Sequence, residues 1–271
     1  MRRLLPIVLV GVVAVAALMM TSCTSVTGGA PTNVTITAAT DSTLTISWTA
    51  PTDGTPDKYY VAFMATGTSS YTDIDTTTAT SYTHDPAGKT GSYKVTAVFG
   101  STTYDAAANP STAPIATSAT TVSELNATGN SGFGWDRTAG TGSTYSMTAA
   151  GNAANVDFYI TDFATGFGGT TYSIASPDQG PSDPGAVVPT GSWRVNAFSS
   201  ALTSETAPLP VHSGTTYFNF TDLSTDPIMV ACYTADGYYA LAKLSSYNTG
   251  AGTVSVQTWF QPIKGLRLIQ H

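Results

Sequence analysis

The stretch "DPAGKTGSYKVTAVFG", residues 85–100, combines a turn with a long alternating segment. One proline and two glycines near its start favour a tight corner, because proline fixes its φ angle and glycine adopts conformations that other residues avoid. After the corner, Tyr93, Val95, Ala97 and Phe99 occupy every second position. Side chains alternate between the two faces of a strand, so the stretch predicts a corner that leads into a β-strand with one apolar face.

The same pattern extends through residues 30–108. "LTISW", residues 44–48, places Leu44, Ile46 and Trp48 on one face, and "YYVAFMA", residues 59–65, alternates in the same way. Between them lies a turn-rich loop with two prolines and an Asp-Gly pair. Thr, Tyr, Val and Phe favour strands, and no segment after the N-terminal region has a sustained helical period. The sequence therefore predicts an all-β fold class.

Residues 30–106 resemble a fibronectin type III module. The resemblance rests on Pro31 near the start, Trp48 in the second strand, Tyr59 and Tyr60 at the start of the third, and the corner at 85–95. It implies a β-sandwich in which Trp48 fills the core and Tyr93 is a corner tyrosine whose hydroxyl bonds to upstream backbone. The chain contains no Arg-Gly-Asp sequence, so integrin-type adhesion has no support.

Two further regions follow this module. Residues 107–121, "AANPSTAPIATSATT", lack alternation and predict a semi-extended linker. Residues 122–271 contain further short alternating stretches, which predict a second, larger β-sandwich or jelly-roll domain of no recognised family. Within it, residues 238–259 predict a hairpin whose turn uses Asn248, Gly250 and Gly252.

An internal similarity connects the two domains. "TGSYKVTAV" at 90–98 is echoed by "TGSWRVNAF" at 190–198, and a repeated sandwich would place Trp193 where the first domain has Tyr93. The alternative is convergence, because turns rich in Thr, Gly and Ser often precede strands. Repeat architectures usually show about three or more units, which favours convergence.

The N-terminus is typical of an exported protein. Arg2 and Arg3 precede an uncharged apolar segment, the pattern of a secretory signal. "MTSC", residues 20–23, resembles the lipobox of bacterial lipoproteins, although Met20 stands where leucine is usual. The resemblance implies a signal peptide at 1–22, acyl chains such as palmitate on Cys23, and a short tether at 23–29. Several acyl chains anchor a protein stably in a membrane.

The resemblance also bears on location. It implies a lipid-anchored protein of the bacterial cell envelope, and Thr24 is compatible with the outer membrane of a Gram-negative cell. Two alternatives remain open: the apolar segment stays uncut as a membrane anchor, or an ordinary signal peptidase removes it and Cys23 is incidental. All three interpretations export residues 30–271.

Composition limits the classes of partner. The formal net charge is −7 and only 10% of residues are charged, so the chain offers no basic patch for nucleic acid. Polarity comes from Thr, Ser, Asn and Gly, which favours contacts through hydrogen bonds and aromatic faces. The second cysteine, Cys232, has no basic neighbour that would lower its pKa, so we expect a small buried side chain in a strand.

No catalytic residue, metal or cofactor is predicted. The three histidines His84, His212 and His271 lack the spacing of a transition-metal site. The loops holding Asp53 with Asp57 and Asp178 with Asp183 lack the regular ligand spacing of a calcium loop, and turn formation explains them more simply. The carboxyl groups of residues 122–271, among them Glu124, Glu205, Asp136, Asp157, Asp162, Asp222 and Asp236, form no nameable catalytic pair.

Aromatic residues carry the ligand-binding prediction. Trp135, Tyr238 and Tyr239 lie beside Gly, Asp and Thr, a setting typical of sugar-binding faces, although core packing is the alternative for each ring. We therefore expect a non-enzymatic envelope lipoprotein whose C-terminal domain binds a glycan or a protein. An envelope hydrolase acting on glycans would instead show a cleft lined by close carboxyl groups, and a purely structural component would show neither cleft nor aromatic face.

Overall fold

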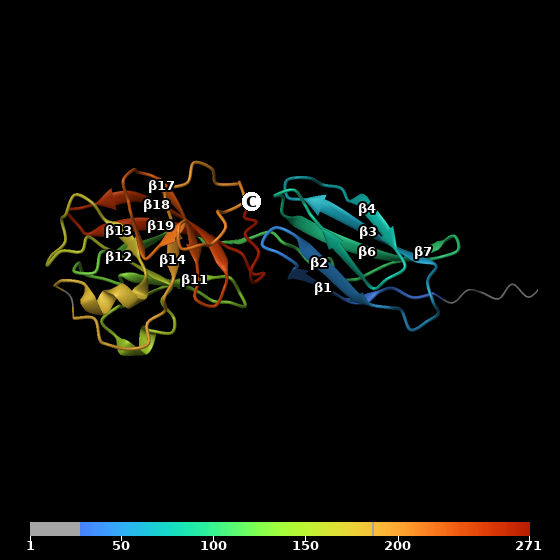
Figure 1. Cartoon of the computed structure of the whole chain (residues 1–271), viewed down its shortest axis with the longest axis horizontal. Helices are drawn as coiled ribbons and strands as arrows, with labels where there is room; N and C mark the ends of the chain where they lie inside the picture. The colour runs from blue at the N-terminus through green and yellow to red at the C-terminus, as the bar shows by residue number, and fades with distance from the viewer. Residues whose placement is uncertain (1–27, 186) are drawn as a thin grey trace, which may run out of the picture.

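The computed structural model describes residues 28–185 and 187–271, and it is built almost wholly of β-strands. Figure 1 shows two β domains side by side along the long axis of the molecule. The first domain is a sandwich of two antiparallel sheets. One sheet has the order β1 (Thr32–Ala38), β2 (Leu44–Thr49), β5 (Ser81–His84), and the other has the order β4 (Thr72–Thr77), β3 (Lys58–Ala65), β6 (Gly91–Phe99), β7 (Thr102–Asp105). The all-β fold class is confirmed.

The core of the first domain follows the alternation of its strands. Leu44, Ile46 and Trp48 of β2 are buried against Tyr93 and Val95 of β6 in a single cluster. The Trp48 ring meets the Tyr59 ring edge to face, with centroids 5.2 Å apart. Trp48 is therefore a core residue, as its place in the resemblance implies.

The corner tyrosine differs from expectation in its hydrogen bond. Tyr93 is fully buried at the corner, but the partner of its hydroxyl is Nδ1 of His84, at 2.8 Å, and not upstream backbone. The reason is local, because His84 ends β5 just before the corner and its ring packs edge to face on Tyr93, with centroids 5.6 Å apart. The histidine ring thus takes the place of a backbone group.

The region predicted as a linker contains paired strands. β8 (Ile115–Ala116) and β9 (Thr120–Ser123) both pair with β19 (Thr253–Phe260) of the second domain. Strand pairing through backbone hydrogen bonds requires an available strand edge but no alternation of apolar side chains. The sequence of 107–121 therefore gave no sign of this pairing. On the other side, the Gly91 N–H donates to Thr112 Oγ1 at 2.9 Å. These residues therefore do not form a free spacer.

The second domain is also a sandwich of two sheets. The five-stranded sheet has the order β11 (Gly142–Tyr145), β10 (Gly132–Trp135), β12 (Phe158–Thr161), β13 (Ser173–Ala175), β16 (Phe220–Asp222). The seven-stranded sheet has the order β15 (Tyr217–Phe218), β14 (Ala197–Ser199), β17 (Ile228–Tyr233), β18 (Tyr239–Asn248), β19, β8, with β9 also on β19. Two 3₁₀ helices, η1 (Ala150–Asn152) and η2 (Pro177–Ser182), lie outside the sheets.

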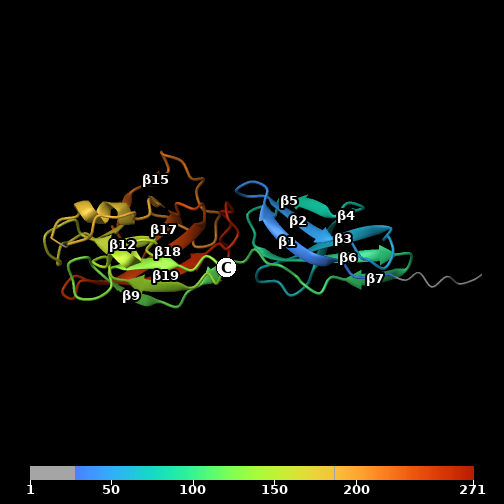
Figure 2. The ribbon, with the colours of Figure 1, turned by 90° about the horizontal axis from the view of Figure 1, so that it is seen from below.

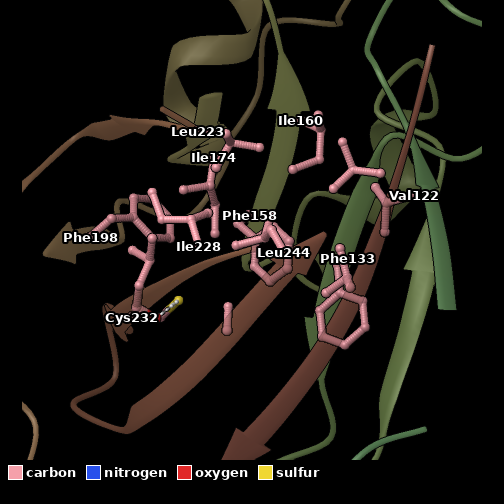
Figure 3. Close-up of a cluster of buried hydrophobic side chains, with 14 of the residues drawn as sticks. Val122, Phe133, Phe158, Ile160, Ile174, Phe198, Leu223, Ile228, Cys232 and Leu244 are labelled. Carbon is pink, nitrogen blue, oxygen red and sulfur yellow. Dashed lines mark hydrogen bonds between the residues drawn. The ribbon is translucent and has the colours of Figure 1, made fainter. Parts of the chain in front are cut away.

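Apolar side chains from both sheets fill the space between them. Figure 3 shows Phe133, Phe158, Ile160 and Ile174 of the five-stranded sheet facing Phe198, Cys232 and Leu244 of the other. Cys232 is buried in β17, and burial raises the pKa of its thiol. This confirms that Cys232 is a small core side chain.

Two sequence details of this domain have clear outcomes. β18 and β19 form the predicted hairpin, in which the Ala251 N–H donates to Asn248 Oδ1 at 3.0 Å and Gly252 has a φ of 65°.

The stretch 190–198 does not reproduce the corner strand of the first domain. Trp193 lies outside the strands and donates to the Pro189 carbonyl at 2.8 Å.

The segment after β19 returns to the first domain. Residues 262–271, which we call the return segment, place Leu266 and Leu268 in the core cluster of the first domain and Ile269 in a cluster of the second. Arg267 donates from its backbone N–H to the Asp41 carbonyl at 2.8 Å and from Nε to Asp41 Oδ2 at 3.0 Å. The two domains therefore share one continuous packed junction, and the C label lies between them in Figures 1 and 2.

The two ends of β6 mark the two ends of the first domain. Gly28, the first described residue, lies against the rings of Phe99 and Tyr104, at the far end of β6 from the second domain. At the near end, Thr90 Oγ1 donates to the Gln270 carbonyl at 2.5 Å. β6 has nine residues, and a strand rises about 3.3 Å per residue. The entry point of the chain is thus separated from the junction by about 30 Å.

Candidate functional site

The three aromatic residues predicted to bind a ligand are packed rather than presented to solvent. Trp135 is 4% exposed and Tyr239 is 3% exposed, while Tyr238 is partly buried against the sandwich core. The structure therefore does not form an open aromatic face from these three side chains. The alternation of the strands was correct, but both outer faces of this sandwich are covered by loops and by the return segment.

Each of the two buried rings has a polar partner. Trp135 Nε1 donates to Thr258 Oγ1 at 2.9 Å, and its ring stacks on Phe260 with centroids 5.8 Å apart. Tyr239 packs on the other side of the seven-stranded sheet, where its hydroxyl accepts the His212 N–H at 3.1 Å. Buried tryptophan and tyrosine usually need such partners, so both residues are satisfied as core side chains.

Tyr238 leads to a charged cluster that sequence reasoning missed. The guanidinium of Arg137 lies over the Tyr238 ring, 5.6 Å from its centroid, and over the Phe260 ring at 5.7 Å. Arg137 also forms a bidentate pair with the buried Asp157, through bonds of 2.7 and 2.8 Å. We call Arg137, Asp157, Arg194, Asn196 and Asp236 the Asp157 cluster.

Asp157 is the centre of this cluster and is fully hydrogen bonded. Its Oδ1 accepts from Arg137, from Arg194 Nη1 at 2.7 Å and from Asn196 Nδ2 at 3.2 Å. Its Oδ2 accepts from Arg137 and from the Trp135 N–H at 2.8 Å. A buried carboxylate is tolerated only when it is paired and hydrogen bonded, and this one holds β10, β12 and the segment before β14 together.

The outer acid of the cluster is Asp236, in the turn between β17 and β18. Burial acts to raise its pKa, but hydrogen bonds from Arg137 at 2.8 and 3.0 Å outweigh it and lower the pKa to about 2. Burial acts to lower the pKa of Arg137, but its hydrogen bonds to Asp157 and Asp236 outweigh burial and raise the pKa. Asp236 and Arg137 are therefore both ionised at neutral pH, and their ion pair braces the aromatic residues around it.

A second acidic group lies near the end of β12 that is away from Asp157. Glu124 is fully buried; burial raises its pKa to about 7, an effect that the nearby Asp162 and Asp183 reinforce. Asp183 is also buried, and its Oδ2 accepts from Tyr159 at 2.8 Å and Thr161 at 2.7 Å. Within the described residues, Glu124 Oε1 and Asp183 Oδ1 have no hydrogen-bond partner. This arrangement favours the protonated form of Glu124 in the folded state below about pH 7.

The acidic group lies away from the surface cavities described in this structure. None of the surface cavities described in this structure is lined by Glu124, Asp183 or Asp157. Across residues 28–185 and 187–271, no group of three or more His, Cys, Asp or Glu side chains is arranged to hold a metal ion. In the same ranges, no helix has the length and apolar character needed to cross a membrane.

A groove of about 460 Å³ opens on the first domain, between the free edges of β4 and β5. Its lining includes the partly buried side chains of Phe63, Ile74 and His84. Exposed hydroxyl side chains at 68, 70 and 72 form part of its rim. Sequence reasoning missed this groove because it assigned the first domain only a structural role.

The sequence carried one signal for the Asp157 cluster. Asp157 interrupts the apolar run "NVDFYI", and only five basic residues occur in 122–271: Arg137, Arg194, Lys243, Lys264 and Arg267. A buried acid in a domain so poor in bases must recruit some of them. Which of the five does so depends on tertiary packing. The ligand-binding role of Trp135, Tyr238 and Tyr239 stays a prediction.

Comparisons with known proteins recognise the first domain. Residues 29–125 match the family model of the fibronectin type III domain. Similar solved structures include the FN5 domain of Drosophila Lar, with 16% identity and a TM-score of 0.26 over 31% of this chain and 92% of that chain. The two-domain fibronectin type III segment of chicken tenascin has 10% identity and a TM-score of 0.26, over 83% and 97%. A search of the curated proteins found no match.

Proposed function

We propose that this protein is a non-enzymatic lipoprotein of the bacterial cell envelope, in which the fibronectin type III domain is a fixed spacer and the molecule binds a glycan or a protein. Cys23 is the proposed site of lipid attachment. It lies outside the described residues, so the anchor rests on the sequence pattern at 20–23. The membrane is then the first partner of the chain, through that anchor.

One observation carries the spacer role: the return segment packs into both domains. Leu266 and Leu268 are buried in the first domain, and Arg267 Nη1 donates to the Leu209 carbonyl of the second at 3.0 Å. A segment shared by two cores restricts hinge motion more strongly than a single connecting strand does. The second domain is thereby held about 30 Å from the point where the chain enters the first.

A hydrolase is the weaker candidate. The carboxyl group whose pKa is raised to about 7, Glu124, would suit a general acid, but it is fully buried and lines none of the described cavities. A general acid must come within hydrogen-bond reach of its substrate. The shape of the molecule therefore favours binding over hydrolysis.

The anchor is tested by mass spectrometry of the mature N-terminus and by membrane fractionation. We expect wild type in the membrane fraction with an acylated Cys23, and Cys23→Ala in the soluble fraction. Cys232→Ala is the matched control and should remain with the membrane, because Cys232 is buried in β17. An unmodified N-terminus that begins elsewhere would overturn the lipoprotein assignment.

A further inference from the structure

The groove between β4 and β5 has the composition of a small-ligand site. Its volume, about 460 Å³, lies within the range of ligand pockets, roughly 300–1,000 Å³. Phe63 and Ile74 supply apolar surface, and the Phe63 ring packs on Tyr93 with centroids 4.8 Å apart. The apolar lining is therefore fixed by the core beneath it.

His84 adds a polar group to this lining. Its Nδ1 is engaged with the Tyr93 hydroxyl at 2.8 Å, and its ring packs edge to face on Phe63 with centroids 5.4 Å apart. Burial lowers the pKa of His84, although the neighbouring Asp85 opposes this, so the ring is neutral at pH 7. A neutral imidazole held through one nitrogen leaves Nε2 to accept or donate one hydrogen bond to a ligand.

The rim of the groove selects against strongly charged ligands. Thr68, Ser70 and Thr72 contribute hydroxyl groups, which both donate and accept hydrogen bonds. Asp85 and Lys89 are the two charged side chains of the lining, and their charges cancel. A ring with an apolar face and many hydroxyl groups matches such a surface better than an ion does.

The groove also borders the domain junction. The Gly88 backbone, between the lining residues Ala87 and Lys89, lies against the Pro208 side chain of the second domain. Pro208 lines a second cavity, of about 220 Å³, together with Leu209 and Arg267. Ligand sites occur preferentially at domain interfaces, and the two cavities flank one contact.

We propose that the groove lined by Phe63, His84 and Thr72 binds a neutral sugar unit, with the ring face on the apolar lining and its hydroxyl groups toward the rim. This inference rests on the proposed function and deepens it, since it names the site and the class of ligand. The first domain would then bind the ligand in addition to acting as a spacer. A peptide is less well matched, because the polar lining, apart from Asp85 and Lys89 with their opposite charges, consists of side-chain hydroxyl groups and an imidazole.

The test is an NMR titration of the full chain carrying Cys23→Ala, which removes the proposed anchor and changes no described residue. The probes are cellobiose, maltose, lactose and N,N′-diacetylchitobiose, with tri-alanine as the peptide probe. We expect at least one disaccharide to shift the backbone amides of residues 68–74, 84–85 and 87–89 in a saturable manner. A ligand of this size on an open groove should bind with a Kd on the order of 1 mM.

Variants decide whether the groove is responsible. Thr72→Trp and Ser70→Trp fill the groove from exposed positions and should weaken binding by at least about tenfold. Thr103→Trp is the control, because Thr103 is exposed on β7, at the other edge of the same sheet. It should leave the Kd unchanged.

Three results would overturn the proposal: no saturable shift with any disaccharide, shifts that both groove-filling variants leave unchanged, or saturable shifts with tri-alanine alone. None of them bears on the lipid anchor, which is tested separately.

Discussion

Arg267 and Asp41 are bound to each other twice, once through backbone and once through side chains, across 226 positions of sequence. Asp41 lies in the turn between β1 and β2 of the first domain, and Arg267 lies in the return segment. The same guanidinium donates to the Leu209 carbonyl. One side chain therefore connects a turn of the first domain with a loop of the second.

This relationship predicts a small energetic effect and a larger geometric one. Both side chains are partly exposed, and such ion pairs contribute only about 0.2–1 kcal/mol. We expect that coupling energy from a double-mutant cycle with Arg267→Ala and Asp41→Ala, measured by urea unfolding. Distances between spin labels on the two domains should become more broadly distributed in Arg267→Ala. An unchanged distribution would show that the buried leucines alone fix the junction.

Truncation of the return-segment leucines should unfold the first domain more easily. Leu266 and Leu268 are both fully buried in its core. Leu266→Ala and Leu268→Ala should each lower the free energy of unfolding by about 2–5 kcal/mol, measured in urea by following the backbone amide signals of β2 and β6. Lys264→Ala, at an exposed position of the same segment, should have little effect. Equal stability of all three variants would contradict the shared core.

Loss of the charge on Asp157 should destabilise the second domain. Asp157→Asn keeps the shape of the side chain but leaves Arg137 and Arg194 without their buried counter-charge. Breaking a buried pair in this way costs about 3–5 kcal/mol, which calorimetry would show as a lower Tm. The control is Asp53→Asn, at an exposed position of a loop in the first domain. A Tm equal to that of the control would mean that the cluster is not structural.

Glu124 predicts how stability depends on pH. Its folded pKa, about 7, lies above the unfolded value near 4.5, so its proton stabilises the folded state fully below pH 4.5. That stabilisation is lost as the pH rises through 7. Wild type should therefore be less stable at pH 8 than at pH 5, with a contribution from Glu124 on the order of 3 kcal/mol.

The matched variant is Glu124→Gln, which keeps an uncharged side chain at every pH. Its unfolding free energy should vary less between pH 5 and pH 8, and it should exceed that of wild type at pH 8. Asp183, whose pKa is also raised by burial, remains in both proteins. Parallel pH profiles for wild type and variant would exclude Glu124 as the titrating group.

Alternation was a reliable guide where one face of a strand meets one core. It predicted the inward face of β2 with Trp48, the strand that follows the corner, and the β18–β19 hairpin with its Asn248 and Gly252 turn. It could not predict the fate of Tyr239, because alternation assigns a side chain to a face without showing whether a loop covers that face. The cluster that buries Tyr239 includes Ile269 of the return segment.

Partners distant in sequence were beyond prediction for a related reason. Asp157 takes its counter-charges from residues 20 positions before and 37 positions after it. The segment "GLRLIQH" contains alternating leucines, but its sequence does not show in which domain they are buried. Local patterns encode the strands, whereas these contacts are decided by how the strands stack.

The return segment also sets an order of assembly. Leu266 and Leu268 follow the entire second domain in the chain, yet they complete the core of the first. A growing polypeptide emerges from its N-terminal end, so the domain that is synthesised first lacks two of its buried side chains until the other has been made. The N-terminal domain is therefore begun first, but it can be completed only after the chain of the second domain has been made.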